Sequence, residues 1–164
     1  MICKKLHAKK YKMPLSNGNS LLWEKSATLS SLNDIAVDIA NELTKKYFCL
    51  WLTAPVGGGK TTVVRQILYS IGLNKKIPVT SPTYSYLNEY EIETKIFAHV
   101  DCYRGNKFVM DVDSMLSDTD FYGAFIEWPI LKTEYSLSTA THLLKISIDN
   151  SKLESRRYSF YILD

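Results

Sequence analysis

The chain has 164 residues and a formal net charge of +3, and its composition of 46% hydrophobic and 23% charged residues is that of an ordinary globular protein. No run approaches the roughly 20 apolar residues that a membrane helix needs, and no apolar segment follows the basic N-terminus as in a secretory signal. Three cysteines without a C-x-x-C spacing indicate reduced thiols, so we expect a cytoplasmic protein with no membrane partner.

Charge is concentrated at the N-terminus, where five lysines and no acid occur among the first twelve residues. We expect residues 1–20 to form a basic tail or irregular segment and residues 21–164 to form a single domain. A basic tail could contact RNA phosphates, although most such tails are simply solvated chain ends. The role of this segment stays open.

Strand and helix patterns follow the tail. Residues 21–26 are typical of a short strand. From Ser31, a residue type that caps helices, apolar side chains recur at helical spacing to about residue 46, and Asp34 completes a weak capping box. Residues 48–53 form a short apolar run, which predicts a buried strand.

A glycine-rich segment, A-P-V-G-G-G-K-T, follows that strand and precedes a helical pattern over 62–71. Gly57, Gly58 and Gly59 lack side chains, so their backbone N–H groups can approach phosphate oxygens closely. A helix that begins near Lys60 adds free N–H groups and the positive end of its dipole. We expect Lys60 to contact the β- and γ-phosphates and the Thr61 hydroxyl to ligate Mg²⁺.

The neighbours of this motif complete the expected nucleotide site. Thr62 follows in the motif and is counted among the nucleotide-binding residues. Ala54 stands where the usual G-x-x-x-x-G-K-[ST] pattern has its first glycine, and alanine is small enough to end the strand there. The alternative is a flexible turn with a chance Lys-Thr pair, but the strand and helix on either side favour the nucleotide site.

Two later apolar runs, over 95–101 and 124–129, are predicted strands that deliver Asp101 and Glu127 to the edge of a sheet. We expect Glu127 to be a second Mg²⁺ anchor and a catalytic residue, the alternative being an ion-paired acid at a strand end. Asp101 is the candidate to orient the attacking water. His99 shares its strand face, and we expect it to steady Asp101 by a hydrogen bond.

The remaining segments carry weaker signals. Ser81 and Thr83 lie in a two-proline stretch over 77–87, which predicts either a loop that senses the γ-phosphate or a plain turn that leads into a strand. Trp128 is expected either near the nucleotide or in the core. Residues 105–120 suggest a helix plus loop, and residues 142–148 and 157–163 suggest an antiparallel pair.

Helices between short apolar strands predict an α/β fold with the phosphate loop at the carboxyl end of a strand. The antiparallel strands at the end of the chain make the expected sheet mixed rather than wholly parallel. We therefore expect a three-layer P-loop NTPase fold with a mixed parallel and antiparallel sheet.

Four segments, in order, resemble motifs of the bacterial TsaE family of small P-loop ATPases. They are G-G-G-K-T-T at 57–62, S-P-T-Y at 81–84, H-V-D-C-Y-R at 99–104 and I-E-W-P at 126–129. The resemblance runs from about Ser26 to the C-terminus. The sequence departs from the family pattern at Ala54, Gly105 and Ile130.

This resemblance implies an ATP- and Mg²⁺-dependent ATPase that is required for the threonylcarbamoyladenosine modification of tRNA and is weak when isolated. The implied partners are proteins of the TsaD and TsaB type, on which the ATPase acts without itself transferring the threonylcarbamoyl group. The resemblance also favours a role for Ser81 and Thr83 in sensing the γ-phosphate. Arg104 would contact either the γ-phosphate, a partner protein or a surface acid.

Three other functions are alternatives to the ATPase in tRNA modification. A small-molecule or nucleoside kinase commonly has a lid with phosphate-clamping arginines, but the only adjacent pair, Arg156 and Arg157, falls in the predicted terminal hairpin. A GTP switch needs an Asn-Lys-x-Asp segment, and N-K-K-I at 74–77 lacks the acid. A non-catalytic scaffold with a decayed loop is disfavoured by the intact Lys60 and Thr61.

Overall fold

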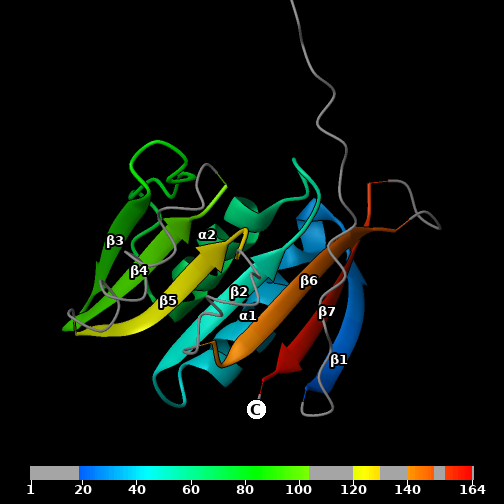
Figure 1. Cartoon of the computed structure of the whole chain (residues 1–164), viewed down its shortest axis with the longest axis horizontal. Helices are drawn as coiled ribbons and strands as arrows, with labels where there is room; N and C mark the ends of the chain where they lie inside the picture. The colour runs from blue at the N-terminus through cyan, green and yellow to red at the C-terminus, as the bar shows by residue number, and fades with distance from the viewer. Residues whose placement is uncertain (1–18, 104–119, 130–139, 150–153, 164) are drawn as a thin grey trace, which may run out of the picture.

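The computed structural model describes residues 19–103, 120–129, 140–149 and 154–163, in which seven strands form one sheet flanked by two α-helices (Figure 1). The predicted helix and loop over 105–120 and the basic tail to residue 18 lie outside these residues. In chain order, the elements are β1 (Ser20–Ala27), a 3₁₀ turn (Leu29–Ser31), α1 (Leu32–Leu43), β2 (Phe48–Thr53), α2 (Lys60–Ile71), β3 (Leu87–Ile92), β4 (Lys95–Asp101), β5 (Phe121–Glu127), β6 (His142–Ile148) and β7 (Arg156–Ile162).

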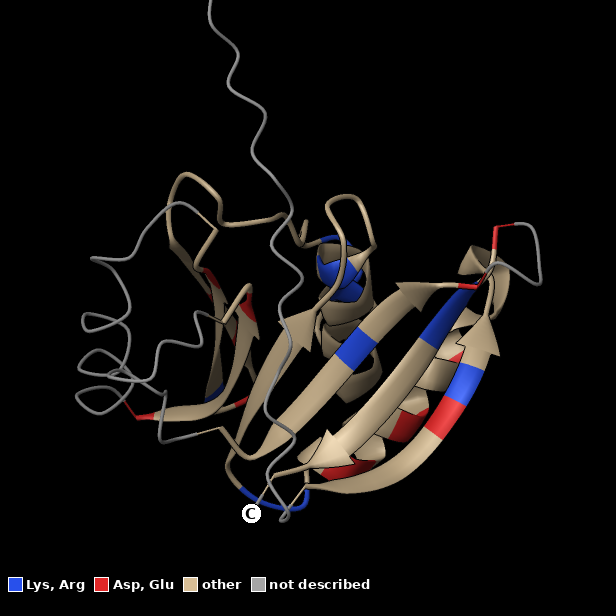
Figure 2. Ribbon diagram, turned by 45° about the vertical axis from the view of Figure 1, so that its right-hand side comes forward, with Lys and Arg blue, Asp and Glu red and all other residues tan. Residues whose placement is uncertain are grey.

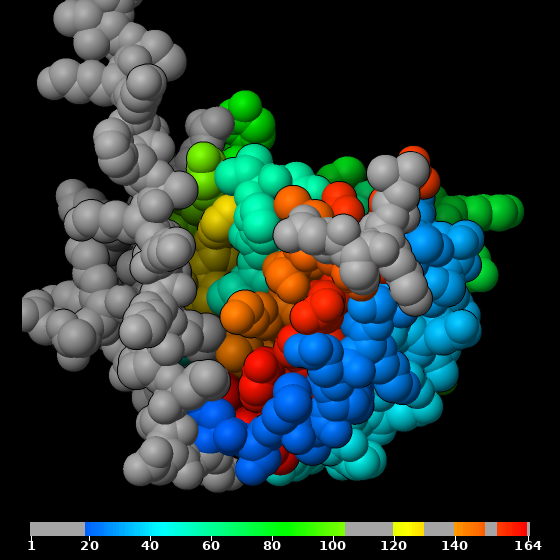
Figure 3. Space-filling model, turned by 90° about the vertical axis from the view of Figure 1, so that its right-hand side faces the viewer, coloured from blue at the N-terminus to red at the C-terminus, as the bar shows by residue number. Residues whose placement is uncertain are grey.

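The strands lie in the order β1-β7-β6-β2-β5-β4-β3. The central four, β6, β2, β5 and β4, are parallel to one another, whereas β3 at one edge and β7 and β1 at the other pair antiparallel. Figure 3 shows the second of these edges, where β1, β7 and β6 lie side by side. The predicted α/β fold with a mixed sheet is thereby confirmed, including the antiparallel pair at the end of the chain.

The parallel centre fixes where the functional residues lie. Parallel strands end at the same edge of a sheet, so the residues that follow β2, β4 and β5 meet there. Asp101 and Glu127 are direct register partners across β4 and β5, and Leu52 is the partner of Glu127 across β2 and β5. The loop that leads from β2 to α2 therefore begins beside both acids.

Both described helices cover the same face of the sheet and pack against each other. In α1 the side chains of Ile35, Ile39 and Leu43 form the apolar stripe predicted from their spacing, and all are buried. Four buried phenylalanines from the strands meet this layer, with Phe48 and Phe125 in edge-on contact at 5.3 Å between ring centroids.

A second cluster, built around Trp51, Val100 and Ile126, lies on the opposite face because side chains alternate along each strand. No helix within the described residues covers that second face, so the described residues form two of the three predicted layers, one of helices and one of strands. Nor is any described helix long and apolar enough to cross a membrane.

The predicted start of α1 differs in detail. The capping box belongs to the preceding 3₁₀ turn, between Thr28 and Ser31, and not to Ser31 and Asp34. The Ser31 hydroxyl accepts a hydrogen bond from the Thr28 backbone N–H at 3.1 Å, so it makes no cap to α1. The Ser31 side chain is therefore engaged by the 3₁₀ turn and is not available to cap α1. The helix also ends at Leu43, where Thr44 bonds back to the Ala40 carbonyl, rather than near residue 46.

Candidate nucleotide-binding site

The loop between β2 and α2 is shaped by its glycines. Gly57 and Gly59 adopt left-handed backbone angles, with φ of 71° and 95°, which side chains other than glycine's tolerate poorly. Gly58 lacks space instead, because a Cβ there would lie 2.8 Å from both the Ala54 Cβ and the Pro55 carbonyl oxygen. The Ala54 methyl thus lies next to the space that an unsubstituted Gly58 leaves free.

Helix α2 begins at Lys60, directly after this loop, and its first turn contains no acid. Figure 2 shows basic but no acidic residues on α2, whereas α1 carries several acids. The free N–H groups and the positive dipole end of α2 therefore have no negative side chain in that first turn, and an anion can bind there.

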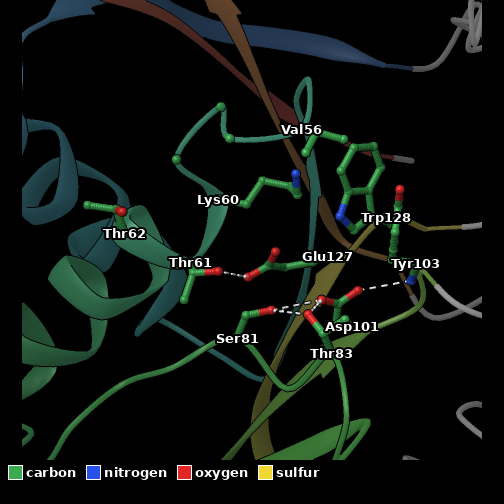
Figure 4. A pocket seen from close by; sticks show the side chains of 13 residues that line it. Val56, Lys60, Thr61, Thr62, Ser81, Thr83, Asp101, Tyr103, Glu127 and Trp128 are labelled. Atoms are coloured by element: carbon green, nitrogen blue, oxygen red, sulfur yellow. Dashed lines mark hydrogen bonds between the residues drawn. The ribbon is translucent and has the colours of Figure 1, made fainter. Parts of the chain in front are cut away.

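A cavity of about 400 Å³ opens at this helix start. Figure 4 shows its side chains, which come from the glycine loop, α2, the 81–83 loop and the ends of β4 and β5. All the residues that the sequence predicted for nucleotide, metal and catalytic roles line it. The lining residues are Val56, Gly57, Gly58, Gly59, Lys60, Thr61, Thr62, Ser81, Thr83, Asp101, Tyr103, Glu127 and Trp128.

The Lys60 ammonium is buried without a paired charge. The residue is 5% exposed, its Nζ lies 3.6 Å from the centroid of the Trp128 ring, and no described carboxylate forms an ion pair with it. Burial lowers the pKa of Lys60, and the nearby charges of Glu127 and Asp101 oppose that shift only in part. A buried cation that forms no ion pair with a described carboxylate is suited to a phosphate group that enters from the cavity.

Glu127 ends β5 and lies between two hydrogen-bond donors. The Thr61 hydroxyl donates to Glu127 Oε1 at 2.7 Å, and His99 Nε2 lies 2.9 Å from the same oxygen. The hypothesis that His99 bonds to Asp101 is therefore wrong. Same-face neighbours on one strand are about 6.6 Å apart, and the register of β4 and β5 brings Glu127 within reach of the imidazole instead.

Asp101 ends β4 and is held by the 81–83 loop. Ser81 Oγ and Thr83 Oγ1 donate to Asp101 Oδ2 at 2.8 and 2.7 Å, and the Tyr103 backbone N–H donates to Oδ1 at 2.9 Å. These three bonds fix a carboxylate that is 3% exposed. A loop 20 residues earlier in the chain is thereby tied to the acid beside the phosphate cavity.

Three further residues line the cavity. No role was predicted for Val56 or Tyr103, and the role of Trp128 was left open. Trp128 has a φ of 57°, which is rare for a bulky residue and typical of functional sites. Its ring contacts that of Tyr103, with centroids 5.2 Å apart. Tyr103 and Trp128 could have been found from their positions in the sequence, because each lies within two residues of an acid that ends a strand.

The side-chain oxygens at this site suit Mg²⁺, which takes few of its ligands from the protein, better than a metal that is bound by several protein side chains. No group of three or more His, Cys, Asp or Glu that could hold a metal occurs within the described residues. Thr61 and Glu127 offer a hydroxyl and a carboxylate side by side, and Mg²⁺ uses one or two protein oxygens together with phosphate oxygens and water. Arg104, Gly105 and Ile130 lie outside the described residues.

The family model described as "Threonylcarbamoyl adenosine biosynthesis protein TsaE" matches residues 26–158. That span includes every lining residue of the cavity.

Three curated proteins named "tRNA threonylcarbamoyladenosine biosynthesis protein TsaE" are similar to the chain. The one from Aquifex aeolicus is 32% identical over 114 residues, which cover 68% of this chain and 76% of that protein. The one from Haemophilus influenzae is 41% identical over 61 residues, 37% of each chain. The one from Borreliella burgdorferi is 30% identical over 89 residues, 48% of this chain and 57% of that one. The chain thus matches less than two thirds of the length of two of these three relatives.

The fold also resembles a solved structure. The crystal structure of Bacillus subtilis YdiB superposes with a TM-score of 0.62 and 21% identity, covering 91% of this chain and 90% of that one. At this level of identity, the superposition bears on the fold alone.

Proposed function

The chain belongs to the TsaE family, and on that premise we propose that it binds and hydrolyses ATP with Mg²⁺ in the threonylcarbamoyladenosine modification of tRNA. It acts on a complex of TsaD- and TsaB-type partners and does not itself transfer the threonylcarbamoyl group. One observation carries the proposal: Lys60, Thr61, Asp101 and Glu127 line one cavity at the start of α2.

Each residue then has a role in hydrolysis. The backbone N–H groups of residues 57–61 bind the phosphates, and the Lys60 ammonium leaves the Trp128 ring for the β- and γ-phosphate oxygens. Thr61 and Glu127 would hold Mg²⁺, which neutralises charge on those phosphates. Asp101 accepts a hydrogen bond from the attacking water, whose oxygen bonds to the γ-phosphorus as the bond to the β-γ bridging oxygen breaks.

The choice of ATP over GTP rests on what the chain lacks outside the phosphate loop, because backbone amides do not distinguish purine bases. At the segment that departs from the guanine-reading pattern, the Asn74 side chain accepts a hydrogen bond from the Lys76 backbone N–H at 3.0 Å. That amide oxygen is engaged in a local turn. A competition titration in which GTP binds more tightly than ATP would contradict this assignment.

Action through partners is supported by the rim of the cavity. Val56 and Tyr103 are 76% and 57% exposed although both are apolar or aromatic, and both border the phosphate site. A contiguous exposed apolar patch commonly marks a surface that a partner covers, and we propose that these two side chains belong to such a surface. We therefore expect slow hydrolysis by the isolated chain. From the pathway in which the family takes part we also propose a cytoplasmic location, with tRNA contacted either indirectly or through the basic N-terminal tail.

A reconstitution tests this function. Threonylcarbamoyladenosine formation on tRNA is measured with TsaD- and TsaB-type proteins in three samples: without this chain, with it, and with its Glu127→Ala variant. We expect repeated turnover only with the unmodified chain. Equal turnover in all three samples would contradict the proposal.

The adjacent arginines considered for the kinase alternative lie away from the cavity. Arg157 lies 3.8 Å from both Glu24 and Asp149, and neither Arg156 nor Arg157 lines the cavity. Transfer of the γ-phosphate to a metabolite, with no free phosphate released, would nevertheless favour that function.

A further inference from the structure

His99 is buried in β4, and its ring contacts an acid at the end of the next strand. It is 0% exposed, its Nε2 lies 2.9 Å from Glu127 Oε1, and its Nδ1 has no hydrogen-bond partner among the described residues. A carboxylate can only accept hydrogen bonds, so the contact places the imidazole proton on Nε2.

The two donors to Glu127 share a single oxygen. Thr61 and His99 both reach Oε1, and the described residues provide no hydrogen bond to Oε2. Figure 4 shows the second oxygen directed away from Thr61, in the cavity that Glu127 lines. The two contacts at Oε1, one from α2 and one from β4, together fix the rotation of the carboxylate.

We propose that His99 is the positioning residue of the site: it clamps Oε1 of Glu127, so that Oε2 is presented to the metal and its water shell. The inference rests on the proposed function and deepens it, because it assigns a role that neither the glycine loop nor the acids provide. The Thr61 hydroxyl can bind a metal through an oxygen lone pair and still donate its proton to Glu127, so Thr61 and His99 together hold Oε1. Of these two donors, His99 is the one to which no metal-binding role is assigned.

Two amide variants separate this role from packing. In His99→Gln the amide nitrogen lies near the former Nε2 and can still donate to Glu127, whereas in His99→Asn it lies near Nδ1 and cannot reach. We expect His99→Asn to weaken Mn²⁺ binding to the protein–ADP complex, measured by electron paramagnetic resonance, by about 10- to 100-fold. His99→Gln should recover most of this loss, and metal-free ADP affinity should not change in either variant.

The unmodified protein provides a second test that does not depend on variants or on hydrolysis. Nitrogen-15 NMR of the nucleotide-free chain should show the His99 proton on Nε2. An imidazole protonated on Nδ1 and not on Nε2, or equal Mn²⁺ affinity in His99→Asn and the unmodified chain, would overturn the inference. If the His99 proton is on Nε2 but the unmodified chain binds no nucleotide, the proposed function is contradicted, whereas the hydrogen bond from His99 to Glu127 is confirmed.

Discussion

The ammonium of Lys60 lies 3.6 Å from the centroid of the Trp128 ring, over its face. A cation over an aromatic face gains about 0.5–2 kcal/mol, so the ring partly replaces the phosphate as the partner of this buried charge. Trp128 adopts a positive φ at that position, a conformation that costs about 1–3 kcal/mol. The free protein thus holds Lys60, the lysine that we propose binds phosphate, against a strained aromatic residue.

This contact predicts an optical signal. When ATP draws Lys60 off the ring, the fluorescence of Trp128 should change and saturate with nucleotide. The chain has two other tryptophans, Trp23 and Trp51, neither of which lines the cavity. Trp128→Phe should therefore abolish the change while ATP binding, followed by calorimetry, persists. A full signal in Trp128→Phe would show that another tryptophan reports binding.

The buried charge of Lys60 also predicts a pH-dependent stability. Burial lowers its pKa in the folded protein below the ordinary 10.5, so between those two values the unfolded chain binds more protons than the folded one. The free energy of unfolding then rises with pH in that window. At neutral pH the cost is fully present, and Lys60→Met should stabilise the nucleotide-free protein by about 0.5–2 kcal/mol.

Urea unfolding of the two proteins at pH 7 and at alkaline pH measures this effect. The advantage of Lys60→Met should shrink as the pH rises through the lowered pKa. Taking the difference between the two proteins removes the contribution of tyrosines such as Tyr158, whose pKa burial raises. An advantage that stays constant across this range would contradict the assignment.

Gly58→Ala should damage the phosphate loop. The new Cβ would lie 2.8 Å from the Pro55 carbonyl oxygen and from the Ala54 Cβ, so the backbone must shift. A displacement of about 1 Å can cost 100-fold at a site that depends on positioning, and we expect ATP affinity to fall at least tenfold in a calorimetric titration. Adding Ala54→Gly removes one of the two clashes and should restore part of the affinity. Unchanged affinity in Gly58→Ala would count against binding by the loop backbone.

Because Ser81 and Thr83 donate hydrogen bonds to Asp101, we expect their removal to slow ATP hydrolysis without weakening ATP binding. Ser81→Ala combined with Thr83→Ala leaves Asp101 without its side-chain donors, each worth about 1.5–3 kcal/mol when the acceptor is charged. Phosphate release should fall while ATP affinity is retained. Ser85→Ala is the matched control, because the Ser85 hydroxyl bonds to Asn88 and not to Asp101. Equal loss in the control would indicate a general effect on the loop.

Much of the site could be predicted because it depends on local pattern. The strand, glycine loop and helix around Lys60 are contiguous in sequence, and the acids at 101 and 127 follow apolar runs that end at one sheet edge. Partners across strands could not be predicted: the contact of His99 with Glu127 depends on the register of β4 and β5. The positive φ of Trp128 and the competing turn at Ser31 depend on tertiary and neighbouring contacts that periodicity does not encode.

We propose above that Lys60 and the glycine loop bind the polyphosphate of ATP, with Mg²⁺ at Thr61 and Glu127. Calorimetric titration of ATP into the purified chain, with and without Mg²⁺, tests it most directly beside the same titration of Lys60→Ala. We expect saturable one-to-one binding that Mg²⁺ strengthens and that Lys60→Ala abolishes. Equal affinity in Lys60→Ala, or no binding by the unmodified chain, would contradict the account.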